Sequence, residues 1–164
     1  HYCWFGKGKL PKIAKKCIRS WKKYCPDYKI VCWNEENFNL SQNLYMRQAY
    51  EAGKWAFVSD YARLKIIYDQ GGIYLDTDVE LIQPIDDLLD YSGFMGFDEK
   101  GIVATGLGFG AEKGNAIVGE FLKDYREISF IQPDGSYDLT PCPDRNTETV
   151  NSGEVSVRGM YGYV

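Results

Sequence analysis

The sequence predicts an α/β domain with a mostly parallel sheet flanked by helices. The chain has 164 residues, of which 45% are hydrophobic and 26% charged, a length and composition that suit one globular domain. It opens with a strand, an amphipathic helix and a second strand, the order that builds a parallel sheet. A helix that is apolar on nearly every side then runs into a third short strand, so we expect the helix to be well buried.

The opening strand, helix and strand occupy residues 1–33. Residues 1–5 are apolar, and because the chain begins inside this strand and without Met, we expect a fragment of a longer protein. Pro11 suits the first turn of the following helix. Apolar residues recur through that helix at helical spacing: Ile13, Cys17, Ile18, Trp21 and Tyr24. Residues 28–33 predict the second strand.

The remaining elements follow in a similar alternation. Helices are predicted at 41–52, 55–70 and 115–127. Strands are predicted at 73–75, 93–97 and 102–110. After residue 130 the pattern decays into loops and weak alternation. We therefore predict one domain over residues 1–143 and a divergent or truncated tail over residues 144–164.

Charge is spread unevenly along the chain. Residues 1–30 hold nine Lys or Arg and one acid, near +8, while the rest is near −12, which gives the net charge of −4. That net charge argues against a general nucleic-acid binder. The basic start predicts a solvated helix face, with a phosphate or an anionic membrane as alternatives. No apolar run approaches the ~20 residues that a transmembrane segment needs, so membrane association would be peripheral.

Cysteine and histidine usage narrows the chemistry. The five cysteines are odd in number and form no CxxC pair, which gives little support to zinc or to disulfides and indicates a reducing compartment. We expect a cytoplasmic protein that reaches the inner face of the membrane at most. His1 is the only histidine, so the chain offers almost nothing for histidine catalysis.

The most specific chemical signal is Asp76-Thr77-Asp78, directly after the 73–75 strand. On extended backbone both carboxylates point to the same side, where they repel unless a cation or protons intervene. The carboxyl ends of strands are where α/β proteins bind ligands. One or two carboxylates plus substrate phosphates are a usual site for Mg²⁺. A solvated turn is the alternative, because a bare D-x-D is common.

Two other features have both a functional and a structural interpretation. Ser59, Asp60 and Arg63 share one side of the 55–70 helix. They form either a polar floor that holds ligand hydroxyls or a buried structural ion pair. Trp4 follows the first strand and either stacks on a nucleobase or belongs to the core.

Together, Phe57–Leu64 (FVSDYARL) and Gly71–Asp78 (GGIYLDTD) resemble the DXD-containing sugar-binding region of glycosyltransferases. The resemblance is greatest to the capsular-polysaccharide and lipopolysaccharide sugar transferases related to the yeast initiating mannosyltransferase and the glucosylating toxins. It covers residues 1–143. Shorter segments that also match are 1–6, 108–114 and 139–143. The resemblance implies the GT-A fold of nucleotide-diphosphosugar transferases, incomplete here at both ends.

The resemblance also implies a reaction. A sugar would pass with retention from a nucleotide-sugar donor, expected to be a UDP-sugar, to a saccharide acceptor in surface-polysaccharide synthesis. Trp4 would stack on the base, Asp60 and Arg63 would hold sugar hydroxyls, and Asp76 and Asp78 would hold Mn²⁺ or Mg²⁺. The donor-binding residues so implied are Trp4, Ser59, Asp60, Arg63, Asp76 and Asp78. No catalytic residue is assigned.

The sequence departs from this family's pattern at its end, and other functions compete. Nothing after residue 143 matches the His- and Trp-containing segment with which such enzymes complete the metal and phosphate site. A catalytically incomplete nucleotide-sugar or carbohydrate-binding domain is therefore one alternative. A haloacid-dehalogenase-type phosphatase is another, although Val79-Glu80 stand where it has Gly-Thr. A calcium loop lacks its required glycine, because Leu81 stands at that position.

Overall fold

Two small sheets, instead of one larger sheet, carry the strands of this α/β fold. The computed structural model describes residues 1–152. In one sheet β1 (Tyr2–Cys3) pairs in parallel with β2 (Cys32–Trp33). The other sheet has the order β3-β5-β4 and is antiparallel throughout. Its strands are β3 (Gly72–Tyr74), β4 (Gly93–Met95) and β5 (Phe109–Ala111).

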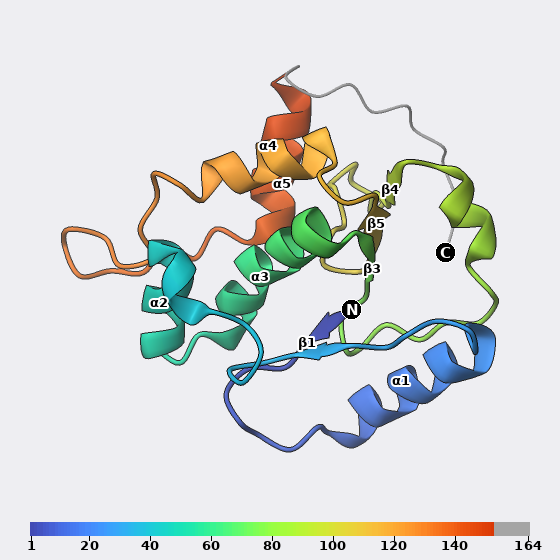
Figure 1. Ribbon diagram of the computed structural model, residues 1–164. Helices are drawn as coiled ribbons and strands as arrows, with labels where there is room; N and C mark the ends of the chain where they lie inside the picture. Colours follow the sequence, from blue (N-terminus) through green and yellow to red (C-terminus); the bar gives the residue numbers. More distant parts are fainter. Residues whose placement is uncertain (153–164) are drawn as a thin grey trace.

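The expectation of a mostly parallel sheet is therefore wrong. Parallel strands need a long crossover, usually a helix, and among the strands that pair with each other only β1 and β2 have one between them. That crossover is α1 (Lys12–Tyr24), which lies beneath both strands in Figure 1. No α-helix separates β3, β4 and β5, and η2 (Asp86–Asp90) is a single short 3₁₀ segment. Loops suffice to reverse the chain, so these strands pair antiparallel.

The other helices gather on the far side of the β1–β2 sheet from α1, around the central helix α3 (Trp55–Gln70) (Figure 1). The flanking elements are η1 (Leu40–Gln42), α2 (Leu44–Glu51), α4 (Ala116–Asp124) and α5 (Cys142–Asn151). Side-chain caps begin three of them, with Asn39 the cap of η1. The Asn43 Oδ1 accepts from the Met46 amide at 2.9 Å, and the Asn115 Oδ1 accepts from the Ile117 amide at 3.0 Å.

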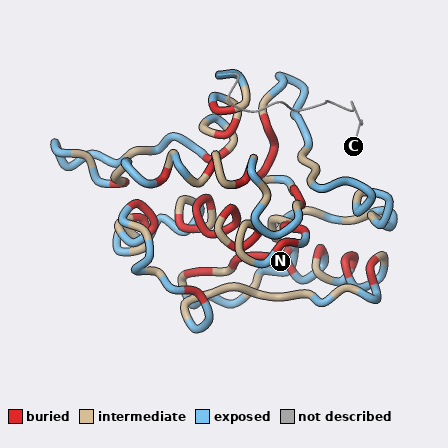
Figure 2. Tube along the Cα trace, turned by 45° about the horizontal axis from the view of Figure 1, so that its top comes forward, coloured by how far each residue is buried: buried red, intermediate tan, exposed pale blue. Residues whose placement is uncertain are grey.

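The core is built around α3, as Figure 2 shows by its run of buried residues. The helix is buried on most of its circumference, and it ends where Gly71 takes a φ of +71°. A second, smaller cluster of Tyr2, Cys17 and Trp21 holds α1 to β1. Because β3 leaves this core directly into residues 75–78, the DXD segment starts from a rigid support.

Several predicted elements are confirmed and others are shorter than expected. The 55–70 helix has the predicted bounds, whereas the first two predicted strands shrink to two residues each. Helix α5 was missed, because Pro141-Cys142-Pro143 looked like a loop although proline is tolerated in the first turn of a helix. The predicted boundary at residue 143 falls in that turn and remains a prediction. Residues 153–164 of the predicted tail lie outside the described residues.

No helix within residues 1–152 combines the length and hydrophobicity that crossing a membrane requires.

Candidate functional site

The DXD segment directly follows β3. One of its two carboxylates is held by hydrogen bonds, and the other is exposed to solvent. Asp76 is half-buried, and its Oδ1 accepts from the Tyr74 hydroxyl at 2.8 Å. Its Oδ2 accepts from Arg63 Nη1 at 3.2 Å. Asp78 is exposed and makes no hydrogen bond or ion pair within the described part of the chain. The two acids therefore offer one oriented carboxylate and one that is free for a ligand.

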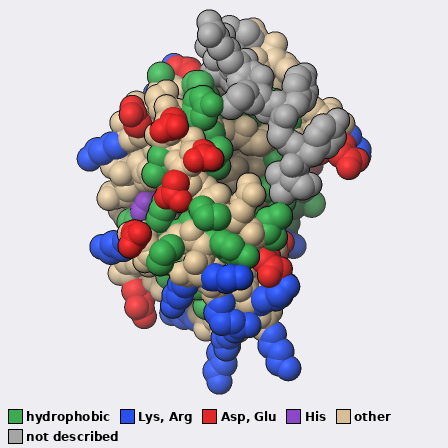
Figure 3. Space-filling model, turned by 90° about the vertical axis from the view of Figure 1, so that its right-hand side faces the viewer, with side chains coloured by type: hydrophobic (Ala, Val, Ile, Leu, Met, Phe, Trp, Pro, Cys, Tyr) green, Lys and Arg blue, Asp and Glu red, His purple; other side chains and the backbone are tan. Residues whose placement is uncertain are grey.

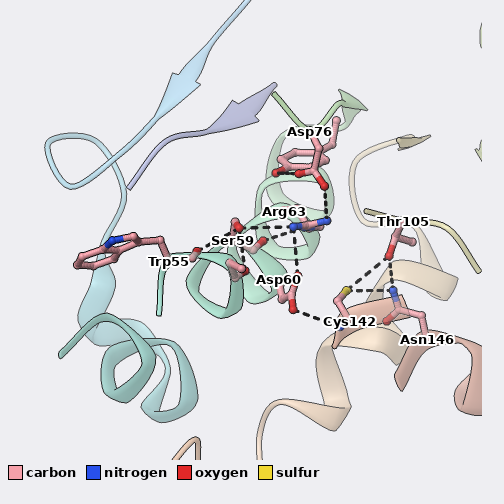
Figure 4. Close-up of polar contacts among 10 residues, drawn as sticks. Trp55, Ser59, Asp60, Arg63, Asp76, Thr105, Cys142 and Asn146 are labelled. Carbon is pink, nitrogen blue, oxygen red and sulfur yellow. Dashed lines mark hydrogen bonds and ion pairs between the residues drawn. The ribbon is translucent and has the colours of Figure 1, made fainter. Parts of the chain in front are cut away.

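Arg63 is the hub of the polar cluster (Figure 4). Its side chain is buried, and its guanidinium lies between two carboxylates, with Nη2 at 3.1 Å from Asp60 Oδ1 and Nη1 at 3.2 Å from Asp76 Oδ2. Its Nε donates to the Ser59 carbonyl at 3.0 Å. The guanidinium carbon also lies 5.0 Å from the centre of the Tyr74 ring, a cation–π distance. One arginine thus joins α3 to the end of β3.

Burial dominates the electrostatics of this cluster. It raises the pKa of the Asp60 and Asp76 carboxyls above the usual value, and Arg63 opposes that shift in both. For Arg63, burial lowers the pKa, but Tyr74, Asp76 and Asp60 outweigh it and raise the pKa well above its usual value. The guanidinium therefore stays charged, and its charge lowers the pKa of both nearby carboxyls against the larger, opposite effect of burial.

A pocket of about 290 Å³ opens beside this cluster. One wall is the segment after β1, with Trp4, Gly6 and Gly8, and the other is the first turn of α3 with Trp55 and Ser59. Its lining also includes Tyr74, Asp76 and Thr77. A pocket this size lies at the lower end of the range for small-molecule sites. The structure thus brings Trp4, Ser59 and Asp76 together around one pocket, and their role in binding a donor remains a prediction.

Three other predicted site residues do not line the pocket. Asp60 and Arg63 lie behind its wall, where Asp60 is fully engaged because its Oδ2 also accepts from the Cys142 amide at 3.2 Å. Asp78 lies just beyond Thr77, outside the lining. Both earlier interpretations of Asp60 and Arg63 remain predictions. Arg63 touches Ser59 and Asp76, so it is one side chain away from the pocket.

Trp55 lines the pocket but is not among the site residues predicted from the sequence. It is 41% exposed, an unusual state for a tryptophan, and its ring packs edge-on against Tyr50 at 5.1 Å. Trp55 and Ser59 are four residues apart and so share a helix face. This spacing was readable in the sequence, but the helix appeared apolar on all sides, which hid the separate role of its first turn.

Gly6 allows the two walls of the pocket to approach. Its φ is +92°, and a Cβ added there would lie 2.7 Å from the Trp55 ring. Its amide donates to Glu35 Oε1 at 2.6 Å, and the Tyr50 hydroxyl donates to the same oxygen at 3.1 Å. The hydrogen bonds of the two donors to Glu35 therefore hold the loop after β1 in place.

Replacing Gly6 by alanine is expected to lower the free energy of unfolding by about 1–3 kcal/mol, because the new Cβ forces both an unfavourable φ and a shift of Trp55. Urea unfolding of the two proteins measures this loss. Gly8→Ala is the matched control, since nothing lies within 4 Å of a Cβ there. An equal loss in both variants would show that Gly6 and Trp55 are not closely packed.

Helix α5 backs the site from the other side. The Thr105 hydroxyl lies 3.5 Å from Cys142 Sγ and accepts from Asn146 Nδ2 at 2.7 Å. Burial raises the pKa of the Cys142 thiol to about 11, so the thiol remains neutral. A Cβ added to Gly106 would lie 3.3 Å from Arg63 Nη1. The segment around residue 105 and α5 together enclose Arg63 from behind.

The acids present fit a divalent cation that takes its other ligands from a substrate. No group of three or more His, Cys, Asp or Glu side chains is arranged as a metal site in residues 1–152. Mg²⁺ is commonly bound by one or two carboxylates together with phosphate oxygens and water. Asp78, with its free carboxylate, and Asp76 provide this donor set. An all-protein site for zinc or calcium has no support among the described residues.

Comparisons with known proteins show a family and a similar fold. The family described as "Glycosyltransferase sugar-binding region containing DXD motif" matches residues 11–95, from the start of α1 to the end of β4. Among solved structures, that of the PaToxG glycosyltransferase is similar, with a TM-score of 0.66 and 18% sequence identity over 93% of this chain and 67% of that chain. At this identity the likeness concerns the fold alone. No curated protein matches the chain.

Proposed function

Because this chain belongs to the family of glycosyltransferase sugar-binding regions containing a DXD motif, we propose that it transfers a sugar from a UDP-sugar to a saccharide acceptor. The proposal includes retention at the anomeric carbon, a GT-A type of fold and a role in surface-polysaccharide synthesis. The observation that carries it is the pocket that runs from two tryptophans to the DXD segment. Membership of this family leaves no support for the phosphatase alternative.

We assign the nucleobase to the end of the pocket between Trp4 and Trp55. Trp4 is half-buried and held by its Nε1, which donates to the Gly8 carbonyl at 2.7 Å. Trp55 is held by its contact with Tyr50. Two restrained aromatic rings lose little freedom when a base stacks between them, and stacking accepts any base. Specificity for uracil would come from the backbone of the Gly6–Gly8 loop.

The diphosphate belongs at the DXD end of the pocket. A Mn²⁺ or Mg²⁺ ion held by Asp78 and Asp76 would stabilise the negative charge of the leaving nucleoside diphosphate. Tyr74 and Arg63 orient the Asp76 carboxylate through its two oxygens. Arg63 also lowers the pKa of that carboxyl, against the larger effect of burial. The protein thus fixes one acid in advance, which reduces the cost of ordering the site when the donor binds.

The donor sugar is proposed to contact Ser59, which lines the pocket, and to reach Arg63 and Asp60 behind the pocket wall past the Ser59 side chain. A carboxylate accepts and a guanidinium donates, so together they can bind sugar hydroxyls. Arg63 Nη2 lies 3.4 Å from Ser59 Oγ, the longest of its contacts and the one easiest to exchange for a hydroxyl. A bound sugar would therefore replace the Ser59 contact first and leave the bridge from Asp60 to Asp76 intact.

Tryptophan fluorescence tests the proposed function without turnover. UDP and UDP-sugars are expected to quench the tryptophan fluorescence of the wild-type chain. Trp4→Leu or Trp55→Leu should each weaken binding by about 5- to 150-fold, the equivalent of ~1–3 kcal/mol per stacked base. Trp33→Phe is the matched control, because Trp33 lies outside the pocket and donates to His1 Nδ1. Unchanged UDP affinity in both pocket variants would rule out this nucleotide site.

A further inference from the structure

One side of α1 carries a continuous row of cationic residues. At 3.6 residues per turn they fall within about a third of the helix circumference. The row consists of Lys12, Lys15, Lys16, Arg19, Lys22 and Lys23, all exposed. The opposite side buries Ala14, Cys17 and Trp21 against β1. In Figure 3, Lys and Arg side chains gather at the lower end of the molecule, where α1 lies.

This basic face, defined by those six residues, is largely unneutralised. Lys16 pairs with Glu80 at 2.5 Å, and Lys23 contacts only the neighbouring Tyr24. Within residues 1–152, Lys12, Lys15, Arg19 and Lys22 form no ion pair with an acid and no side-chain hydrogen bond. Such a concentration of like charge repels itself, and an anionic partner would relieve that repulsion.

The basic face contrasts in charge with the rest of the chain. Residues 31–164 are near −12, so the excess of positive charge is confined to the first 30 residues, which include α1. We propose that the basic face docks on a membrane that contains anionic lipids. Polybasic segments bind such surfaces without penetrating deeply. The exposed Ile13, at the edge of the face, adds one apolar contact.

The shape of the face favours lipid over nucleic acid. It is the convex side of a helix of 13 residues, about 20 Å long, and it has no groove to follow a phosphate backbone. Single-stranded nucleic acid is bound through exposed aromatic rings, and the aromatic residues of α1, Trp21 and Tyr24, are buried or half-buried. A flat charged bilayer needs neither feature.

Docking at a membrane also indicates the class of acceptor. This inference rests on the proposed function. The loop that leads into α1 contributes Gly6 and Gly8 to the pocket, and its Lys7 and Lys9 are exposed beside them. Because this one loop lines the pocket and then continues into α1, we place the mouth of the pocket near the basic face. A chain docked by α1 holds this mouth near the lipid surface, where a saccharide attached to lipid is within reach.

Vesicle co-sedimentation of the full chain tests the docking. We expect binding to phosphatidylcholine vesicles with about 30% phosphatidylglycerol, no binding to phosphatidylcholine alone, and release at high salt. Combined Lys12→Gln, Lys15→Gln and Lys22→Gln changes should weaken binding by about 100-fold, the equivalent of ~1 kcal/mol per charge. The matched control combines Lys100→Gln, Lys113→Gln and Arg126→Gln, which changes the net charge equally and should bind as the wild type does.

Three outcomes would overturn the proposal: equal binding to both kinds of vesicle, an equal loss in the control variant, or preferential binding of a single-stranded RNA at the same salt. Thermal unfolding of both variants checks that they fold. Vesicle binding needs no nucleotide, and the UDP titration of the same variants needs no lipid. Failure of the docking and failure of the proposed function are thereby distinguished.

Discussion

Replacing Arg63 by methionine is expected to lower the free energy of unfolding by about 3–5 kcal/mol. The substitution removes the cation that Asp60, which is buried, shares with Asp76, which is half-buried. Each carboxylate then keeps its desolvation penalty without the compensating ion pair. Urea unfolding at neutral pH measures the loss. The dependence of the unfolding free energy on urea concentration should match that of the wild type, which shows that the denatured state is unchanged.

Arg47→Met is the control for this prediction. Arg47 forms an ion pair with Glu51 at 3.9 Å on the exposed side of α2, and such a pair contributes about 0–1 kcal/mol. A similar loss in Arg63→Met and Arg47→Met would contradict the role of Arg63 as the hub. Arg63→Lys keeps the positive charge but lacks the planar guanidinium. Its loss in the free energy of unfolding is expected to lie between the losses of Arg63→Met and Arg47→Met.

The stability deficit of Arg63→Met should also shrink as the pH falls. Without Arg63, burial raises the pKa of Asp60 further above its unfolded value, so the folded protein binds a proton that the unfolded chain does not yet bind. Between the folded pKa and the unfolded value, stability therefore rises as the pH decreases. A deficit that stays constant between pH 7 and pH 4 would show that Asp60 does not depend on Arg63.

Asp78→Asn is expected to abolish metal-dependent UDP binding while the fold is kept. Substitutions of groups that only orient a metal ligand already cost about 10- to 100-fold, so loss of a direct ligand should cost more than about 100-fold. The fold should be unaffected, because Asp78 is exposed and makes no hydrogen bond or ion pair within residues 1–152. Thermal shifts with UDP and Mn²⁺, compared with Mn²⁺ alone, measure both effects.

The control for Asp78→Asn is Asp87→Asn in η2, another exposed acid that makes no hydrogen bond within the described part of the chain. It should respond to UDP and Mn²⁺ as the wild type does. If Asp87→Asn also lost the shift, the effect would come from general negative charge. If Asp78→Asn kept it, the DXD segment would not hold the ion.

The parts of the site that could be predicted from the sequence involve residues that lie close together along the chain. Residues 55–70 carry an apolar pattern long enough to identify the helix, and Gly71 marks its end. Ser59 and Arg63 then share a face by spacing alone, and Asp76 and Asp78 follow a strand. These signals lie within a window of about twenty residues, where periodicity and turn chemistry determine the structure.

The parts that were missed depend on contacts between distant segments. The Asp60 bond to the Cys142 amide joins residues 82 apart, and the antiparallel pairing of β4 with β5 has no helical crossover to signal it. Helix α5 is mostly polar and begins in a proline-rich segment, so its pattern is weak. Trp4 and Trp55 come to line one pocket because Gly6 lets the loop after β1 approach α3, and this role of Gly6 appears only when the two segments meet.

Calorimetric titration of UDP into the wild-type chain, once with Mn²⁺ and once with EDTA, tests most directly the claim that this pocket binds a nucleoside diphosphate. We expect saturable binding of one UDP per chain with Mn²⁺ and an affinity at least about tenfold lower with EDTA, because the metal is the link between the diphosphate and the two acids. Equal affinity under both conditions, or no binding under either, would contradict the claim.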